Sequence, residues 1–187
     1  MTYALPDPAQ TPGTIFTAFM LASIAALAGV FVFQFGFGLI PCELCLWQRL
    51  PHALAILVAG VGLSQTRAAG RMLYPDKAMP WRMLTALAAV LALLHLAGAG
   101  TAAFHVGVEQ HWWAGTEACT GAAPSGLSVE DLRARLLVTP PARCDQIAWS
   151  LFGITLAGLN LMLEIVLSAA AAWAASRFQA VARKARP

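Results

Sequence analysis

Four long apolar stretches constrain the fold of this chain more than any other feature of its sequence. They run over about residues 14–40, 46–64, 83–104 and 147–173. A membrane-spanning helix needs roughly 20 apolar residues, within a range of about 17–25. The second stretch is short, and it spans a membrane only if Leu46 and Trp47 join its outer end while the Arg49 side chain extends toward the headgroups. The sequence therefore predicts an all-α membrane protein, a bundle of four transmembrane helices that forms one domain over residues 1–187.

The composition supports the membrane class. Only 11% of the residues are charged and 59% are hydrophobic, whereas a soluble domain carries about 25% charged residues. No basic patch with interleaved aromatic residues suggests a nucleic acid partner. Residues 1–13 contain no Lys or Arg, and the apolar run that follows is longer than the h-region of about 7–15 residues in a signal peptide. We therefore expect the first stretch to be a membrane helix.

The positions of lysine and arginine predict the orientation in the membrane. Eight of the 12 lie in the segment between the second and third stretches or after the fourth. Segments rich in Lys and Arg stay in the cytoplasm, so we expect both termini in the cytoplasm of a bacterial cell. The loops over about 41–49 and 105–146 then face the periplasm. All four cysteines lie in these two loops, on the oxidising side of the inner membrane, where disulfides persist.

The second periplasmic loop contains one expected element of its own. Ser128 is a suitable N-cap, and Asp131 follows three residues later. Apolar residues between 129 and 136 then recur on one helical face, and the prolines at 140 and 141 end the pattern. The loop is therefore predicted to contain a short amphipathic helix that lies on the membrane surface.

Cys42 and Cys45 form a C-x-x-C pair between the first two stretches. Such a pair is either a redox site or part of a metal site. A four-cysteine zinc site needs a second close pair, whereas Cys119 and Cys144 are 25 residues apart. A disulfide within C-x-x-C closes a small ring and is commonly redox-active. We therefore favour a redox pair over a metal site or a structural disulfide.

The surroundings of Cys45 favour a reactive thiol. Pro51 suits the first turn of a helix, so Cys45 is expected near a helix N-terminus. Arg49, four residues after Cys45, then shares its helical face. A helix N-terminus and a nearby cation both stabilise a thiolate, while the negative charge of Glu43 opposes it. The spacing alone leaves open which influence dominates.

Cys119 and Cys144 allow two interpretations. As a structural disulfide they would stabilise a long loop by about 2–4 kcal/mol. As an exchanging disulfide they would need only a thiolate within reach of one sulfur. Cys119 lies among small residues, in a setting that a partner protein could approach.

Polar residues within or beside the apolar stretches are further candidates. His105 closes the third stretch and could donate a hydrogen bond to a carbonyl ligand, or simply be solvated. His52 and His95 are expected to be polar residues between packed helices. Glu164, with Asn160 one turn earlier, lies inside the fourth stretch toward its cytoplasmic end. An interhelical hydrogen bond is therefore preferred for Glu164 over a role at the cysteines.

Taken together, these motifs resemble the bacterial disulfide bond formation protein B (DsbB) family, which are quinone-dependent thiol oxidases of the inner membrane. The resemblance covers nearly the whole chain. Its carriers are Pro41-Cys42-Glu43-Leu44-Cys45-Leu46-Trp47-Gln48-Arg49, Phe104-His105-Val106-Gly107-Val108-Glu109, Trp112-Trp113 ahead of Cys119-Thr120-Gly121, and Cys144-Asp145 with Trp149 and Phe152-Gly153. The first motif is specific in combination with the second, widely spaced cysteine pair.

The resemblance implies an enzyme that reoxidises a soluble periplasmic dithiol oxidase of the DsbA type and passes the electrons to ubiquinone or menaquinone. Carried over by position, Cys119 would form the mixed disulfide with the partner, and Cys144 would pass electrons to Cys42. Cys45 would then form a thiolate adduct or a charge-transfer contact with the quinone.

The same resemblance would place Arg49 and His105 at the quinone ring, with no metal ion. Two alternatives remain beside it. One is a dedicated relative that serves a single special partner, and the other is a non-catalytic protein with four spans and two structural disulfides. Vitamin-K-epoxide-reductase-like proteins share the chemistry, but the cysteine placement fits the DsbB family better.

Overall fold

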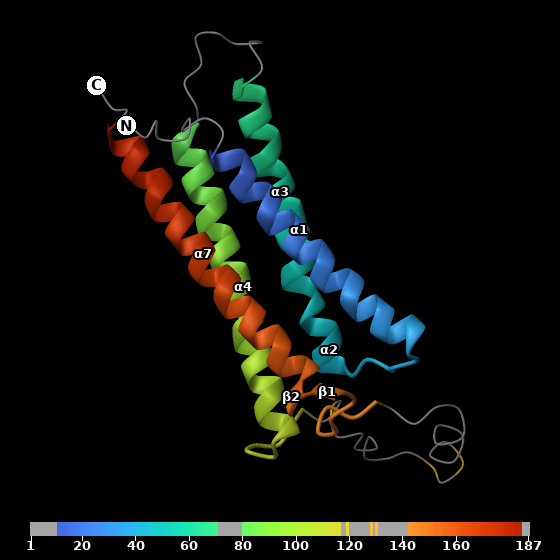
Figure 1. The fold of residues 1–187 in the computed structure, drawn as a ribbon. Coiled ribbons are helices and arrows are strands. Elements are labelled where there is room, and N and C mark those ends of the chain that lie inside the picture. Colours follow the sequence, from blue (N-terminus) through green and yellow to red (C-terminus); the bar gives the residue numbers. More distant parts are fainter. Residues whose placement is uncertain are drawn as a thin grey trace.

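The computed structural model describes residues 11–70, 80–116, 119, 128, 130 and 142–184. The described part of the chain contains four helices long and apolar enough to cross a membrane, which run side by side in one bundle (Figure 1). They are α1 (Thr11–Phe31) with the π-helical turn η1 (Val32–Gly36), α2 (Glu43–Trp47) with α3 (Arg49–Gly70), α4 (Trp81–Glu109) and α7 (Leu156–Lys184). The predicted fold class, an all-α bundle of four membrane helices, is confirmed.

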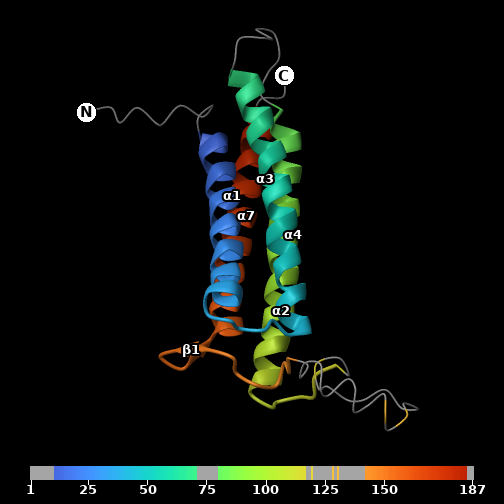
Figure 2. The same cartoon turned by 90° about the vertical axis from the view of Figure 1, so that its right-hand side faces the viewer.

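The helices pack through small residues. α4 lies along α7, α1 lies along α3, and α3 also contacts α4, an arrangement that the turned view in Figure 2 makes visible. Ala59, Ala88 and Ala171 are buried in the same cluster as Phe16 and Phe178. Small side chains let helix backbones approach closely, which is how membrane helices gain packing energy.

Cys42 forms the N-cap of the helix that carries the C-x-x-C pair. Its Sγ accepts a hydrogen bond from the backbone N–H of Cys45 at 3.3 Å. The helix is then interrupted at Gln48, between α2 and α3. Pro51 accounts for this break, because it has no N–H to donate to the carbonyl four residues earlier. The sulfur atoms are therefore held at the first turn of the second membrane helix.

The first helix ends before its apolar stretch does. The stretch was predicted to continue to residue 40, but the π-helical turn ends at Gly36. Gly38, directly after the C-cap residue Phe37, has a φ of 71°. A glycine in this left-handed conformation commonly terminates a helix, so backbone geometry rather than hydropathy sets the boundary.

The fourth helix begins later than the apolar stretch predicted. The stretch starts near residue 147, yet α7 starts at Leu156 and is preceded by an antiparallel hairpin of β1 (Ser150–Leu151) and β2 (Ile154–Thr155). Phe152 and Gly153 between the strands have φ values of 50° and 82°. Positive φ at both central residues is what a two-residue type I′ turn requires. This apolar segment therefore turns at the end of the bundle instead of extending the helix.

The two ends of the bundle differ in charge and chemistry. α2, the hairpin and the C-terminal end of α4 lie together at the lower end in Figure 1, and the cysteines belong to this end. Arg67, Arg82 and Lys184 lie on the last or first turns of helices at the opposite end. This separation is what the predicted orientation requires, although the orientation itself stays a prediction. The amphipathic helix predicted in the second loop, over about 128–136, lies outside the described residues.

Candidate redox site

The fold brings all four cysteines into one cluster. Cys42, Cys119 and Cys144 are buried against Val108, and Cys45 packs against them. Cys119 and Cys144 form a disulfide with their Cα atoms 4.9 Å apart. Cys42 and Cys45 carry free thiols, and their Sγ atoms are 2.9 Å apart. Two pairs that are far apart in the sequence are thus packed into one cluster, one bonded and one reduced.

Cys119 is less accessible than its small neighbours suggested. Its side chain is fully buried, although a partner protein was expected to approach it. Gly115 lies so close that an added Cβ would meet the Cys119 Cβ at 2.9 Å and Val108 at 3.2 Å. Gly115 therefore packs tightly against Cys119, and attack by a partner requires the Cys119 sulfur to become exposed.

The geometry of the C-x-x-C pair fits a disulfide better than a zinc site. The disulfide between Cys119 and Cys144 leaves no thiolates for a four-cysteine site. Cys42, Cys45 and His105 do lie close enough together to hold a metal ion, with ligand atoms within 4.8 Å of one another. Two thiolates on a tetrahedral zinc ion, with Zn–S bonds of about 2.3 Å, would be about 3.8 Å apart. The sulfur separation of 2.9 Å is shorter than this.

The two thiols of the pair differ in their hydrogen bonds. Cys42 Sγ donates to Cys45 Sγ at 2.9 Å and accepts from the Cys45 backbone N–H. The hydrogen bond with Cys45, together with burial, raises the pKa of the Cys42 thiol. Cys42 therefore keeps its proton, and Cys45 is the sulfur placed to carry a negative charge. Glu43, whose charge was expected to oppose a thiolate, accepts a hydrogen bond from Thr116 Oγ1 at 3.0 Å.

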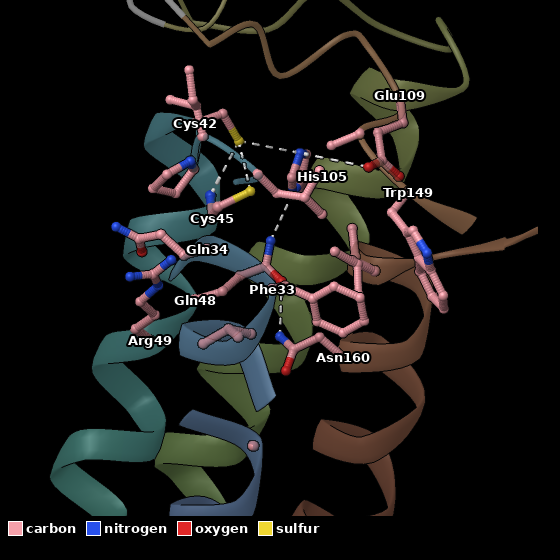
Figure 3. Close-up of a pocket in the computed structure, with 18 of the residues that line it drawn as sticks. Phe33, Gln34, Cys42, Cys45, Gln48, Arg49, His105, Glu109, Trp149 and Asn160 are labelled. Atoms are coloured by element: carbon pink, nitrogen blue, oxygen red, sulfur yellow. Dashed lines mark hydrogen bonds and ion pairs between the residues drawn. The ribbon is translucent and has the colours of Figure 1, made fainter. Parts of the chain in front are cut away.

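A cavity of about 120 Å³ lies beside Cys45, between the ends of the four membrane helices. Figure 3 shows the side chains around it. Phe33 and Trp149 form an aromatic wall, with ring centres 4.9 Å apart. An engineered cavity of about 150 Å³ binds benzene, so this cavity is of the size that holds one small ring. His105 and Arg49 also line it.

Four residues that line this cavity have a buried polar atom without a partner among the described residues. The atoms are Arg49 Nε, Gln34 Oε1, His52 Nδ1 and Glu109 Oε2, and the side chains of Arg49 and Gln34 are labelled in Figure 3. The guanidinium carbon of Arg49 lies 5.1 Å from the centre of the Phe31 ring. Buried polar groups normally have a hydrogen-bond partner, and an exception indicates a ligand, an ion or water. Gln34 was not predicted from the sequence, since a lone polar residue in an apolar stretch gives no sign of what it faces.

His105 connects the cysteine pair to polar side chains between the helices. Its Nε2 lies 3.6 Å from Cys42 Sγ, and its Nδ1 lies 2.7 Å from Gln48 Nε2. Asn160 Nδ2 on α7 donates to Gln48 Oε1 at 2.8 Å. These dashed contacts are drawn in Figure 3. Gln48 was not predicted as a site residue, and its one sequence signal is its spacing one helical turn before His52.

Deeper in the bundle the same polar network continues. His52 Nε2 lies 3.0 Å from Asn160 Oδ1 and 3.3 Å from Glu164 Oε1. His95 Nδ1 lies 2.6 Å from Glu164 Oε2. Glu164 therefore makes the interhelical hydrogen bond that was expected of it. It was expected to be separate from the cysteines, whereas His52 and Asn160 link it to them.

The comparisons with known proteins agree with this arrangement. The family model for the disulfide bond formation protein DsbB matches residues 12–174 of the chain. The chain belongs to the DsbB family. It is also 24% identical, over 148 residues, to an uncharacterized protein of Rickettsia prowazekii (strain Madrid E), a match that covers 78% of this chain and 77% of that protein. No solved structure matches the chain.

Membership in the DsbB family confirms the resemblance seen in the sequence. It makes this chain a multi-pass membrane protein of disulfide bond formation and indicates an oxidoreductase role. The four helices and the closely spaced cysteines are what such a protein needs. The electron acceptor and the protein partner are matters for a proposal.

Proposed function

We propose that this protein is a thiol:quinone oxidoreductase of a bacterial inner membrane. It reoxidises a DsbA-like dithiol oxidase in the periplasm and passes the electrons to a membrane quinone, either ubiquinone or menaquinone. The observation that carries the proposal is that both cysteine pairs pack in one cluster, beside a ring-sized cavity. Cysteine pairs that only stabilised the fold would need neither this shared cluster nor the cavity.

The first exchange takes place at the loop disulfide. A thiolate of the partner attacks Cys119 Sγ, the bond to Cys144 breaks, and Cys144 leaves as a thiolate. The second thiol of the partner then attacks the mixed disulfide, which frees Cys119 and leaves the partner oxidised. Two electrons have moved from the partner to the loop pair. Because Cys119 is buried, this step requires its sulfur to become exposed to the partner.

The second exchange passes the electrons to the C-x-x-C pair. Cys144 as a thiolate attacks Cys42 in a Cys42–Cys45 disulfide, and Cys45 leaves as a thiolate. Cys119 then attacks Cys144, which restores the loop disulfide and frees Cys42. The outcome has the bonding that the structure shows, with the loop pair bonded and the C-x-x-C pair reduced.

The cavity supports a quinone as the electron acceptor. Its volume suits one ring, and Arg49 Nε–H lacks the acceptor that a quinone carbonyl oxygen would supply. Arg49, Gln34 and the aromatic pair of Phe33 and Trp149 would hold the ring. A bound quinone would take up two electrons and two protons. Cys45 lines the same cavity, and Cys42 is 2.9 Å away, in position to form the disulfide.

The orientation follows from the two ends of the bundle. The cationic end, which carries Arg67, Arg82 and Lys184, belongs in the cytoplasm according to the distribution of Lys and Arg in membrane proteins. The cysteine end then faces the periplasm, where a dithiol oxidase can reach it, and both termini lie in the cytoplasm.

The proposal is tested with purified protein, a reduced periplasmic dithiol protein and a soluble quinone. We expect the quinone to be reduced at the rate at which the donor thiols disappear. The Cys45→Ser variant should bind the donor but reduce no quinone. If the wild-type protein neither binds nor reduces quinone, the chain is a non-catalytic membrane protein with two structural disulfides.

A further inference from the structure

A chain of polar contacts leads from a buried carboxyl group in the middle of the bundle to the cysteine pair. It starts at Glu164, which is fully buried and whose Oε1 lies 3.3 Å from His52 Nε2, an ion-pair distance without hydrogen-bond geometry. Hydrogen bonds then link His52, Asn160, Gln48, His105, Cys42 and Cys45. Cys45 lies on α2 with Cys42 as its N-cap, and Gln48 is the C-cap of α2. His52 lies on α3, His105 on α4, and Asn160 and Glu164 on α7. Gln48 and His52 are one turn apart in the second membrane helix, as Asn160 and Glu164 are on α7.

The direction of each link follows from where the amide oxygen and nitrogen atoms of Asn160 and Gln48 lie in the structure. A carbonyl oxygen only accepts, so His52 Nε2–H donates to Asn160 Oδ1. The Asn160 amide N–H donates to Gln48 Oε1. The Gln48 amide N–H donates in turn to His105 Nδ1.

The same direction continues to the sulfur atoms. Because Nδ1 of His105 accepts, the hydrogen of the neutral ring is on Nε2, which faces Cys42 Sγ at 3.6 Å. The Cys42 thiol donates to Cys45 Sγ. All donors therefore point the same way, and the chain ends on the sulfur that carries the negative charge. Hydrogen bonds in such a chain polarise and strengthen one another.

The opposite direction of donation is also chemically possible, so a further group must favour one direction over the other. If both amides turned over together, Asn160 would donate to His52, Gln48 would accept from His105 Nδ1–H, and His105 Nε2 would accept from the Cys42 thiol. In that state His105 would donate no hydrogen bond to Cys42, and the Cys42 thiol would donate none to Cys45. Glu164 biases this choice, because its Oε1 lies 3.3 Å from His52 Nε2 without forming a hydrogen bond, and an oxygen lone pair there is repelled by a ring lone pair but not by an N–H.

We propose that Glu164 is a positioning residue that sets the direction of this chain through His52, Asn160 and Gln48, and thereby stabilises the thiolate form of Cys45. The proposal rests on the proposed function, since it concerns how the same cysteine pair is tuned. It adds a role for a carboxyl group that does not touch the reacting atoms.

Other groups near the pair act on it independently of Glu164. Glu109 Oε1 lies 3.9 Å from His105 Nε2, and the backbone of Cys144 also interacts with this ring. Arg49 and Glu109 act on Cys45 through their charges. These groups are unchanged by a substitution at Glu164, so the effect of Glu164 can be measured against a constant background.

The test uses the purified full-length protein without quinone. The Cys42–Cys45 pair is equilibrated with glutathione buffers, and the fraction of reduced pair is measured by alkylation. Glu164→Gln keeps the side-chain volume but can present an N–H to His52. Losing a donor to a charged sulfur is expected to shift the equilibrium about tenfold toward the disulfide, which is about 30 mV for a two-electron couple. The ultraviolet absorbance of the thiolate at neutral pH should fall in parallel.

Two further variants make the result independent of any folding defect in Glu164→Gln. Asn160→Leu breaks the chain without touching Glu164 and should shift the equilibrium in the same direction. Gly98 on α4 lies against the Glu164 carboxyl group, where an added Cβ would overlap it, so Gly98→Ala should also shift it. Gly100→Ala is the matched control, because an added Cβ there meets no atom within 4 Å.

The outcomes separate this proposal from the proposed function. An equilibrium in well-folded Glu164→Gln and Asn160→Leu that equals the wild-type value would overturn the positioning role, even if the wild-type protein reduces quinone. Failure of the wild-type protein to reduce quinone would overturn the function, while the glutathione equilibrium still reports on the chain.

His52, His95 and Glu164 also lie close enough to hold a metal ion. If chelation of the wild-type protein reproduces the shift, the cluster is a metal site and the positioning role is wrong.

Discussion

Cys42 and Cys45 lie three residues apart at the start of a membrane helix, whereas Cys119 and Cys144 lie 25 residues apart in the segment between α4 and α7. The first pair contacts His105 and, through it, the polar side chains of Gln48 and Asn160. The second pair is bonded and packs against Val108. Side chains on rigid helices can hold a hydrogen-bond geometry, while a loop can open toward a partner.

This difference suggests a division of labour between the pairs. The helix pair is the one whose thiolate is tuned by surrounding groups, and it lies beside the cavity. The loop pair needs no such tuning, because a thiolate is supplied by the attacking partner. Both pairs belong to one packed cluster, and this proximity favours exchange between them.

The largest expected effect comes from removing one cysteine of each pair. Cys119→Ser should abolish oxidation of the protein partner, while Cys42 and Cys45 can still be oxidised by quinone. Cys45→Ser should do the reverse, because the partner can still be captured on Cys119 but its electrons reach no quinone. Quinone absorbance and non-reducing gels with a reduced dithiol partner measure both outcomes.

Cys144→Ser extends the same experiment. It removes the thiol that leaves when Cys119 is attacked, so Cys119 is left as a free thiol. In this arm the oxidised partner is added instead, and Cys119 attacks its disulfide to form a mixed disulfide while one partner thiol is released. If all three variants retained partner turnover, the cysteines would be structural, and the proposed division of labour between the two pairs would be wrong.

A smaller effect is expected within the helix pair. In reduced protein at neutral pH, a neutral alkylating reagent should modify Cys45 before Cys42. The hydrogen bond to Cys45 and burial raise the pKa of Cys42, so Cys42 stays protonated, and a protonated thiol is unreactive. The rate ratio should exceed about tenfold, since each unit of pKa changes the thiolate population about tenfold, and it should narrow as the pH rises. Equal rates at neutral pH would show that the two thiols are equivalent.

The smallest effect is expected at the cavity. Arg49→Ala removes a donor to a neutral carbonyl and should raise the KM for quinone by about tenfold or less. Formation of the mixed disulfide at Cys119 should be unchanged. Arg67→Ala, at the other end of α3, is the matched control and should leave quinone kinetics unaltered. An unchanged KM in Arg49→Ala would remove Arg49 from the site.

Much of the fold could be predicted because a membrane helix must be apolar along its whole length. The helix ends could not, since they depend on backbone conformation. Gly38 closes the first helix, and Phe152 with Gly153 forms a tight turn within residues as apolar as a span. Hydropathy does not distinguish such a hairpin from a helix.

The candidate site divides in the same way. The cysteine pairs and Arg49 were found because their spacing along one segment carries chemical meaning. Gln48 and Gln34 were missed because the groups that they face lie on other helices or in a cavity. The link from Asn160 to the cysteines was missed for the same reason. The relative register of two packed helices is a tertiary property, which spacing within one helix does not determine.

The exchange between the two pairs can be followed most directly by timed thiol labelling. Fully reduced protein is mixed without oxygen with an equimolar amount of quinone, quenched at intervals, and its free thiols are identified by mass spectrometry. The account predicts that Cys42 and Cys45 lose their labels first and regain them as Cys119 and Cys144 become bonded, and that the loop pair stays reduced in Cys45→Ser. Oxidation of the loop pair before the helix pair, or at the wild-type rate in Cys45→Ser, would contradict it.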